Sequence, residues 1–176
     1  GVQTCALPIY PEKDRATADF EQITSLGSNV LRVYHVPPAW LLDLANDRGL
    51  KFLIDVPWWQ TGCFLDTEKT QEEARATVRD AVKSCGNHPA VFAFSVANEI
   101  PPDVVRWHGK VETGRFLDEL VDVAKTVNPQ CLVTFGNFPP TEYLSACRID
   151  FVMFNVYLHQ QKSFERYLSH LQMIAD

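Results

Sequence analysis

Apolar runs alternate with amphipathic segments along most of the chain. Five of the runs are short and nearly continuous, without a strict alternation of apolar and polar positions. They cover residues 29–35, 50–59, 90–99, 131–138 and 150–158. Near-continuous runs of this length are typical of parallel strands that are covered on both faces. The pattern therefore predicts five buried parallel strands.

The segments between these runs have helical periodicity. The first predicted helix would bury Phe20, Ile23 and Leu26 on one face and end at Gly27. Further helices are expected over residues 37–49, 70–86 and 112–127, with a short one over 141–146 and a last one from about residue 163. Strand and helix thus alternate five times, which predicts an α/β fold.

The helix over residues 70–86 carries a specific start signal. Thr70 and Glu73 have the spacing of a capping box, in which each side chain accepts a hydrogen bond from the other residue's backbone N–H. We therefore expect this helix to begin at Thr70.

Two architectures fit this alternation, a doubly wound sheet and a (β/α)8 barrel. Each predicted strand ends in side chains that bind or react: Arg32, Tyr34, His35, Trp58, Trp59, Asn98, Glu99, Asn137, Phe138, Asn155, Tyr157 and His159. In a barrel all these ends meet at one mouth, whereas an open sheet brings together only those near its switch point. We therefore favour the barrel.

Composition excludes several classes of function. The net charge is −6 and no basic run appears, so nucleic acid is not an expected partner. No apolar run approaches the roughly 20 residues that cross a bilayer, and no Gly-rich turn follows a strand, so no dinucleotide or nucleotide cofactor is expected. The five cysteines lack metal-like spacing and are expected to be free, mostly buried thiols. The cellular compartment stays open.

The first nine residues, "GVQTCALPI", resemble the translation of a common sequencing adapter. We expect this segment, residues 1–9, to be an artefact, with the natural sequence beginning near Tyr10. The alternative is a genuine amino-terminal strand, since Val2, Leu7 and Ile9 are apolar. The segment is left out of the fold prediction.

Glu99 is the strongest candidate for catalysis. It follows the apolar strand "VFAFSVAN", and two prolines come soon after it. A carboxyl group at a barrel mouth, beside tryptophans, is poorly solvated, which favours the protonated form that a general acid for glycosidic cleavage requires. Asn98 would point to the other side of the strand end and bind a sugar hydroxyl. The alternative is a solvated Glu at a helix start.

Longer stretches resemble a known family. "HPAVFAFSVANEIPPD" resembles the fourth-strand segment of the clan A glycoside hydrolases, which are retaining (β/α)8 enzymes. "SNVLRVYHVPPAWLLDLANDRGLKFLIDVPW" is similar to strands two and three of the glycoside hydrolase family 2 TIM-barrel catalytic domain. "PPDVVRWHGKVE", "NFPPTEYL" and "DFVMFNVYLH" most resemble a bacterial subgroup in which such a barrel is joined to a family 2 glycosyltransferase. The resemblance covers residues 11–176.

The resemblance implies roles for several residues. Glu99 would be the acid/base, and Asn98 would contact the 2-hydroxyl of the sugar. Arg32 and Tyr157 would hold the nucleophilic carboxylate by hydrogen bonds. Further substrate contacts are expected from the remaining strand-end residues and from aromatic rings: Tyr34, His35, Trp58, Trp59, Trp107, Asn137, Asn155 and His159. For Asn137 a role in forming a turn fits equally well, and for His35 and His159 a place in a solvated loop.

The chain also departs from the family pattern. The family's nucleophile is a Glu at the end of strand seven, for which residues 10–176 offer no equivalent, and the adapter-like text stands where strand one should be. The resemblance thus implies a truncated barrel domain over residues 10–176 with strands two to six present and one, seven and eight missing. Such a fragment would be inactive by itself. Arg32 would then lack its carboxylate partner if that partner is the nucleophile.

Three functions compete at this point. The first is a retaining β-glycosidase or transglycosylase that acts on a β-linked glucan or a related oligo- or polysaccharide. The second is a non-catalytic glycan-binding barrel attached to a polysaccharide synthase. A lyase or aldolase is disfavoured, because no strand end carries a Schiff-base lysine or a metal-binding cluster.

Overall fold

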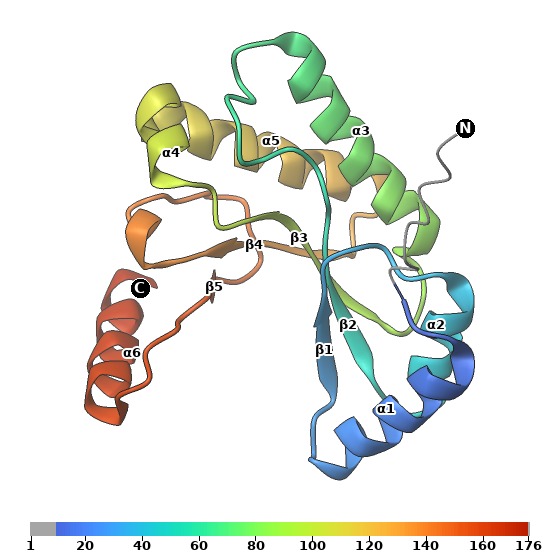
Figure 1. The fold of residues 1–176 in the computed structure, drawn as a ribbon. Coiled ribbons are helices and arrows are strands. Elements are labelled where there is room, and N and C mark those ends of the chain that lie inside the picture. The colour runs from blue at the N-terminus through green and yellow to red at the C-terminus, as the bar shows by residue number, and fades with distance from the viewer. Residues whose placement is uncertain (1–9, 176) are drawn as a thin grey trace, which may run out of the picture.

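The computed structural model describes residues 10–175. The adapter-like segment lies outside the described residues. Five parallel strands form one sheet in chain order, and helices cover its convex side (Figure 1). The strands are β1 (Val30–Val33), β2 (Lys51–Asp55), β3 (Val91–Asn98), β4 (Leu132–Asn137) and β5 (Met153–Phe154). The predicted α/β class with parallel strands is confirmed.

The sheet curls, as the barrel prediction requires. Five flat strands would place the outer two about 19 Å apart at the usual spacing. Yet the guanidinium of Arg32 on β1 donates a hydrogen bond to the side chain of Asn155, directly after β5. The two edge strands therefore approach each other across a mouth, and the sheet forms part of a barrel.

Helices form the outer layer of this half-barrel. They are α1 (Lys13–Ser25), α2 (Ala39–Asn46), α3 (Glu68–Cys85), α4 (Pro102–His108), α5 (Lys110–Val127) and α6 (Gln161–Ala175), with a 3₁₀ turn at Pro139–Thr141. Helices α3 and α5 pack together over the middle strands, where Arg75 donates to Glu119 at 2.7 Å. Seen in Figure 1, the molecule forms an arch with two legs. Helix α6 forms one leg, and helices α1 and α2 lie on the other.

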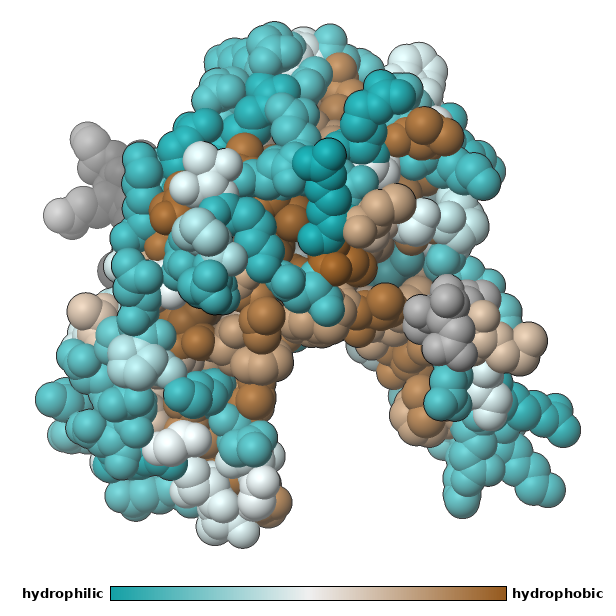
Figure 2. Space-filling model, turned by 180° about the vertical axis from the view of Figure 1, so that it is seen from behind, coloured by the Kyte–Doolittle hydropathy of each residue, from teal (hydrophilic) through white to brown (hydrophobic). Residues whose placement is uncertain are grey.

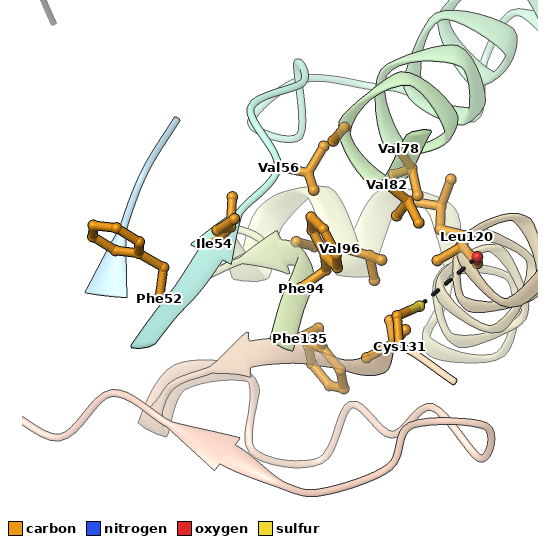
Figure 3. Close-up of a cluster of buried hydrophobic side chains, with 14 of the residues drawn as sticks. Phe52, Ile54, Val56, Val78, Val82, Phe94, Val96, Leu120, Cys131 and Phe135 are labelled. Carbon is orange, nitrogen blue, oxygen red and sulfur yellow. Dashed lines mark hydrogen bonds between the residues drawn. The ribbon is translucent and has the colours of Figure 1, made fainter. Parts of the chain in front are cut away.

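The hydrophobic core lies between the sheet and these helices. Phe94 and Val96 of β3 point toward α3 and α5, whereas Phe52 of β2 points away from these two helices (Figure 3). Phe94 and Val96 are fully buried there, and the Cys131 thiol lies within 3.8 Å of the Ala124 carbonyl of α5. The core is continuous from α1 to α5, which explains why the strand sequences are apolar throughout.

The hollow side of the sheet is also partly apolar. Figure 2 shows hydrophobic residues beneath the arch, between the two legs of the molecule. Val30 shares a strand face with Arg32, and Leu132 shares one with Gly136, so both point inward. Val30 is 40% exposed and Leu132 is 37% exposed. The inner surface of the half-barrel is therefore only partly covered by the described residues.

Several element predictions are wrong in detail. Helix α3 begins at Glu68, and its N-cap is Thr67, whose hydroxyl accepts from the Thr70 N–H at 3.2 Å. The capping box at Thr70 therefore does not form. The run over 150–158 pairs with β4 only at Met153–Phe154, and the short helix over 141–146 is replaced by the 3₁₀ turn before it.

Two further details differ from the sequence prediction. Leu26 is exposed, because α1 ends at Ser25 and the chain turns away there. Gly27 does end this helix, with a left-handed φ of 80°. The described cysteines are all free, as expected, but only Cys85 and Cys131 are buried.

Candidate active site

The chain turns sharply where β3 ends. Glu99 has φ of 50°, in the left-handed region that non-glycine residues seldom occupy, while its N–H donates to the Gly136 carbonyl at 2.8 Å. This turn breaks the alternation of side chains along the strand. Asn98 and Glu99 consequently reach the same neighbour, the amide nitrogen of Asn155. The expectation that Asn98 points to the other side is wrong.

Arg32 of β1 and Asp55 of β2 form an ion pair at the mouth. Nε of Arg32 lies 2.6 Å from one carboxylate oxygen of Asp55, and Nη2 lies 3.1 Å from the other. The Asp55 side chain is 6% exposed and that of Arg32 is 23% exposed. Arg32 therefore has a carboxylate partner within this chain, and the expectation that it would lack one is wrong.

The two asparagines extend the network from Arg32. Nη2 of Arg32 donates to Oδ1 of Asn98 at 2.6 Å, and Nη1 donates to Oδ1 of Asn155. Nδ2 of Asn155 donates in turn to Oδ1 of Asn98 at 2.8 Å. Asn155 is buried beneath the mouth, so it is placed to order its neighbours as well as to touch a substrate.

Glu99 receives two hydrogen bonds on the same oxygen. Nδ2 of Asn155 lies 2.6 Å from Oε1, and the Tyr157 hydroxyl lies 2.8 Å from it. Donation to Glu99 raises the pKa of Tyr157, with smaller contributions from burial and from the charge of Glu99. In this structure Tyr157 therefore contacts the predicted acid/base, whereas the family resemblance implied a contact with the nucleophile.

Gly136 of β4 leaves the space that this network occupies. A Cβ added there would lie 2.7 Å from Oδ1 of Asn98 and 2.9 Å from Nη2 of Arg32. Any side chain at this position would displace one or both groups. The sequence analysis missed Gly136, since an absent side chain gives no chemical signal.

The three tryptophans that were predicted as substrate contacts, Trp58, Trp59 and Trp107, differ in their surroundings. Trp58 packs edge-on against Phe64 and Phe116, and its Nε1–H donates to the Val96 carbonyl. The rings of Trp59 and Trp107 are mostly exposed. A Cβ at Gly62 would overlap the Trp59 ring, so the glycine leaves room for this ring. The Trp107 ring is held by Asp66, which accepts a hydrogen bond from Nε1 of Trp107 at 3.1 Å.

The remaining predicted residues divide between the mouth and the scaffold. Arg32 lies over the ring of Tyr34, 5.2 Å from its centroid. His35 and His159 are both exposed. Asn137 is buried, with its Nδ2 bound to the Leu144 carbonyl, so its contacts are those of a turn-forming residue.

Sequence reasoning missed two other members of the site. Asp55 was not proposed as a site residue, although a carboxylate at the end of an apolar strand is the natural partner for Arg32 on the neighbouring strand. Gln60 accepts from the Asn98 backbone N–H at 2.8 Å. Nothing in its sequence surroundings marked it.

The described residues show no sign of a metal site or a membrane span. Among residues 10–175, three or more His, Cys, Asp or Glu side chains nowhere cluster as metal ligands would. Over the same residues, the helices are all too short or too polar to cross a bilayer.

The sheet is parallel and curled, and a carboxylic acid, amides and exposed aromatic rings lie at the carboxyl ends of its strands. This arrangement is typical of a TIM-barrel domain, which has its active site at the mouth. The chain belongs to glycosyl hydrolase family 2, because the family description "Glycosyl hydrolases family 2, TIM barrel domain" matches residues 12–174.

Solved structures with the same fold include several bacterial β-glucuronidases. The chain matches β-glucuronidase 3 of Bacteroides uniformis with a TM-score of 0.74 at 19% identity, covering 92% of this chain and 21% of that one. The Bifidobacterium dentium enzyme, complexed with coumarin-3-O-glucuronide, gives 0.76 at 18% identity, covering 94% and 28%. The Ruminococcus gnavus enzyme gives 0.72 at 17% identity, covering 92% and 31%. The chain thus spans less than a third of each relative. Among curated protein sequences none matches it.

Proposed function

We propose that this chain is the part of a retaining β-glycoside hydrolase or transglycosylase that carries the acid/base, Glu99. The observation that carries the proposal is the position of Glu99 at the mouth, where Asn155 and Tyr157 hold one oxygen of its carboxyl group. A general acid must present its proton at a fixed place beside the leaving-group oxygen. The donors that follow β5, an edge strand of the described sheet, would provide that fixed place.

The hydrogen bonds also distinguish the two oxygens of Glu99. Both bonds end on Oε1, and none from the described residues ends on Oε2. Oε2 is therefore the atom that would carry the proton to the glycosidic oxygen. In the second half of a retaining reaction the same oxygen would take a proton from water. The Nδ2 group of Asn98 donates to no described residue, which leaves it for a sugar hydroxyl.

A retaining reaction needs a second carboxylate about 5–5.5 Å from the first. Asp55 is unsuited to this role, because Arg32 occupies both of its oxygens. We expect the nucleophile to be a Glu of strand seven, outside residues 10–175, so this stretch would be inactive alone. A fused glycosyltransferase domain, and a β-linked glucan as substrate, are our finer proposals. The β-glucuronidase neighbours make β-glucuronides a class to test beside them.

The proposal can be tested with Glu99→Gln in the full-length protein. With an aryl β-glycoside that has a poor leaving group, turnover should fall about 10²–10⁴-fold, because the amide cannot donate the proton. A dinitrophenyl glycoside needs no such proton, so formation of its glycosyl-enzyme should be nearly unchanged. Steady-state release of the phenol measures turnover of the poor substrate, and the pre-steady-state burst of dinitrophenol measures formation of the glycosyl-enzyme.

Glu142→Gln is a matched control. Glu142 also accepts from a tyrosine, Tyr167, at 2.8 Å, but it belongs to a contact with α6 outside this network. This variant should keep full turnover. Equal turnover of Glu99→Gln and the wild type on the poor substrate would remove Glu99 as the acid. A wild type that binds glycans tightly without cleaving any would favour the non-catalytic barrel.

A further inference from the structure

Asp55 is a buried carboxylate with no role in the mechanism proposed above. Its side chain is nearly inaccessible, and both oxygens accept from Arg32. No hydrogen bond joins Asp55 to Glu99 directly. Its influence on the site must therefore pass through the guanidinium.

The guanidinium determines how the two asparagine amides are oriented. Arginine is only a donor, so a side-chain amide that faces it must present its oxygen. Arg32 faces Asn98 with Nη2 and Asn155 with Nη1. The nitrogen of Asn155 must then point away from Arg32, and it points at Oε1 of Glu99, 2.6 Å away.

Asp55 in turn fixes the guanidinium. The bidentate pairing with distances of 2.6 and 3.1 Å holds its plane in one orientation. Burial works to lower the pKa of Arg32, but the hydrogen bond and the charge of Asp55 outweigh it, so the pKa is raised and the group stays charged. Without this partner a half-buried cation would turn toward another anion, and Glu99 is the nearby carboxylate in the network.

We propose that Asp55 is a positioning residue, which holds Arg32 so that the Asn155 amide presents its N–H to Glu99 and the acid/base keeps its place at the mouth. This inference rests on the function proposed for Glu99. According to this inference, Asp55 at the end of β2 helps to position Glu99, the acid/base that directly follows β3.

The test is Asp55→Asn in the full-length protein. The amide has one oxygen and one NH₂ group, so it cannot accept from Arg32 on two separate atoms as the carboxylate does. Arg32 should therefore swing, and the Asn155–Glu99 contact should loosen. Misplacement of a catalytic group by about 1 Å costs on the order of 10²-fold in rate. We expect kcat on the poor-leaving-group glycoside to fall about 10- to 100-fold, and glycosyl-enzyme formation from the dinitrophenyl glycoside, which needs no proton from Glu99, to fall much less.

Asp150→Asn is the matched control for loss of an ion pair. Asp150 pairs with Lys125 at 2.7 Å and accepts from the Val133 N–H, near the start of β4 and far from the mouth. This variant should lose stability and keep the ratio of the two activities. An Asp55→Asn protein that loses both activities equally, or neither, would overturn the positioning role.

A second variant approaches the network from the other side. Gly136→Ala leaves Asp55 intact but pushes on Asn98 and Arg32. It should show the same selective loss, and an unselective loss would count against the proposal even if Asp55→Asn fails to fold. Glu99→Gln run in parallel separates the two hypotheses. If Glu99→Gln has no effect on turnover, the proposed function is wrong. If Glu99→Gln shows the selective loss and Asp55→Asn does not, only the positioning role of Asp55 is wrong.

Discussion

At the scale of single residues, the site depends on a departure from regular strand geometry. Consecutive residues of a strand point to opposite faces, but the left-handed turn at Glu99 brings its side chain and that of Asn98 to the same amide. Strained backbone of this kind costs on the order of 1–3 kcal/mol and persists only where the surroundings enforce it. Here the Glu99 N–H bond to Gly136 and the Asn155 contact do so.

Tyr157 offers a direct probe of this arrangement. Its raised pKa means that the hydroxyl stays protonated, and the contact with Glu99 intact, at and below the ordinary tyrosine value of 10.0. The contact is lost only as pH rises through the higher folded value. Glu99→Gln removes the charge and should lower the pKa of Tyr157. NMR titration of tyrosines labelled at Cζ, assigned with Tyr157→Phe, measures this.

Tyr167 is the internal reference for that titration. Burial raises its pKa first, and donation to Glu142 raises it further. Glu99→Gln should leave the Tyr167 titration unchanged. A Tyr157 curve that is also unmoved by Glu99→Gln would show that the two groups do not interact in solution.

The sequence identified the charged and aromatic members of the site but not the contacts between them. Arg32, Asn98 and Glu99 stood out because polar groups at the ends of apolar strands need an explanation. Asp55 was missed because the pairing register of β1 and β2, which brings it to Arg32, is a tertiary property. Gly136 contributes by lacking a side chain. Trp58, expected as a substrate contact, packs against Phe64, a contact that its own sequence surroundings do not show.

At the scale of elements, the order of strands and helices was predictable and their ends were not. Apolar runs and helical periodicity located all five strands, because burial dictates both patterns. The start of α3 shows the limit of local motifs. Thr67 caps the helix although Thr70 and Glu73 have the better-known spacing, since the Thr70 hydroxyl instead bonds the Phe64 carbonyl of the preceding loop.

The alternative caps make opposite predictions for mutants. Thr67→Ala should destabilise the first turn of α3 by about 1 kcal/mol, which corresponds to an approximately fivefold loss of protection in hydrogen exchange. Glu73→Ala should change protection little, because its contact with Lys69 is long and exposed. Exchange of the first-turn amides followed by mass spectrometry compares them. A larger loss of protection in Glu73→Ala than in Thr67→Ala would show that the capping box of Thr70 and Glu73 forms after all.

At the scale of the whole molecule, the half-barrel has two open edges and a partly apolar hollow. Strands β1 and β5 each lack a partner on one side among the described residues. Val30 adds an exposed apolar side chain at one of these edges. Unpaired edges and exposed apolar surface promote association.

We therefore expect residues 1–176, expressed alone, to self-associate or to lack a cooperative melting transition. Sedimentation velocity and thermal denaturation test this. Val30→Lys places a charge on the open edge and should reduce association, whereas Val111→Lys, at an exposed position on α5, should not. A monodisperse wild-type monomer that melts cooperatively would contradict the expectation.

The hydrogen bond between Arg32 and Asn155 has a consequence for the order of folding. The two residues are 123 positions apart in the sequence, and every strand of the sheet lies between or beside them. Closing so long a loop costs entropy that only the intervening strand pairs can offset. The contact should therefore form after those pairs. Intermediates that lack any one of these five strands would have no oriented amide beside Glu99, so the acid/base would gain its fixed position only once all five have paired.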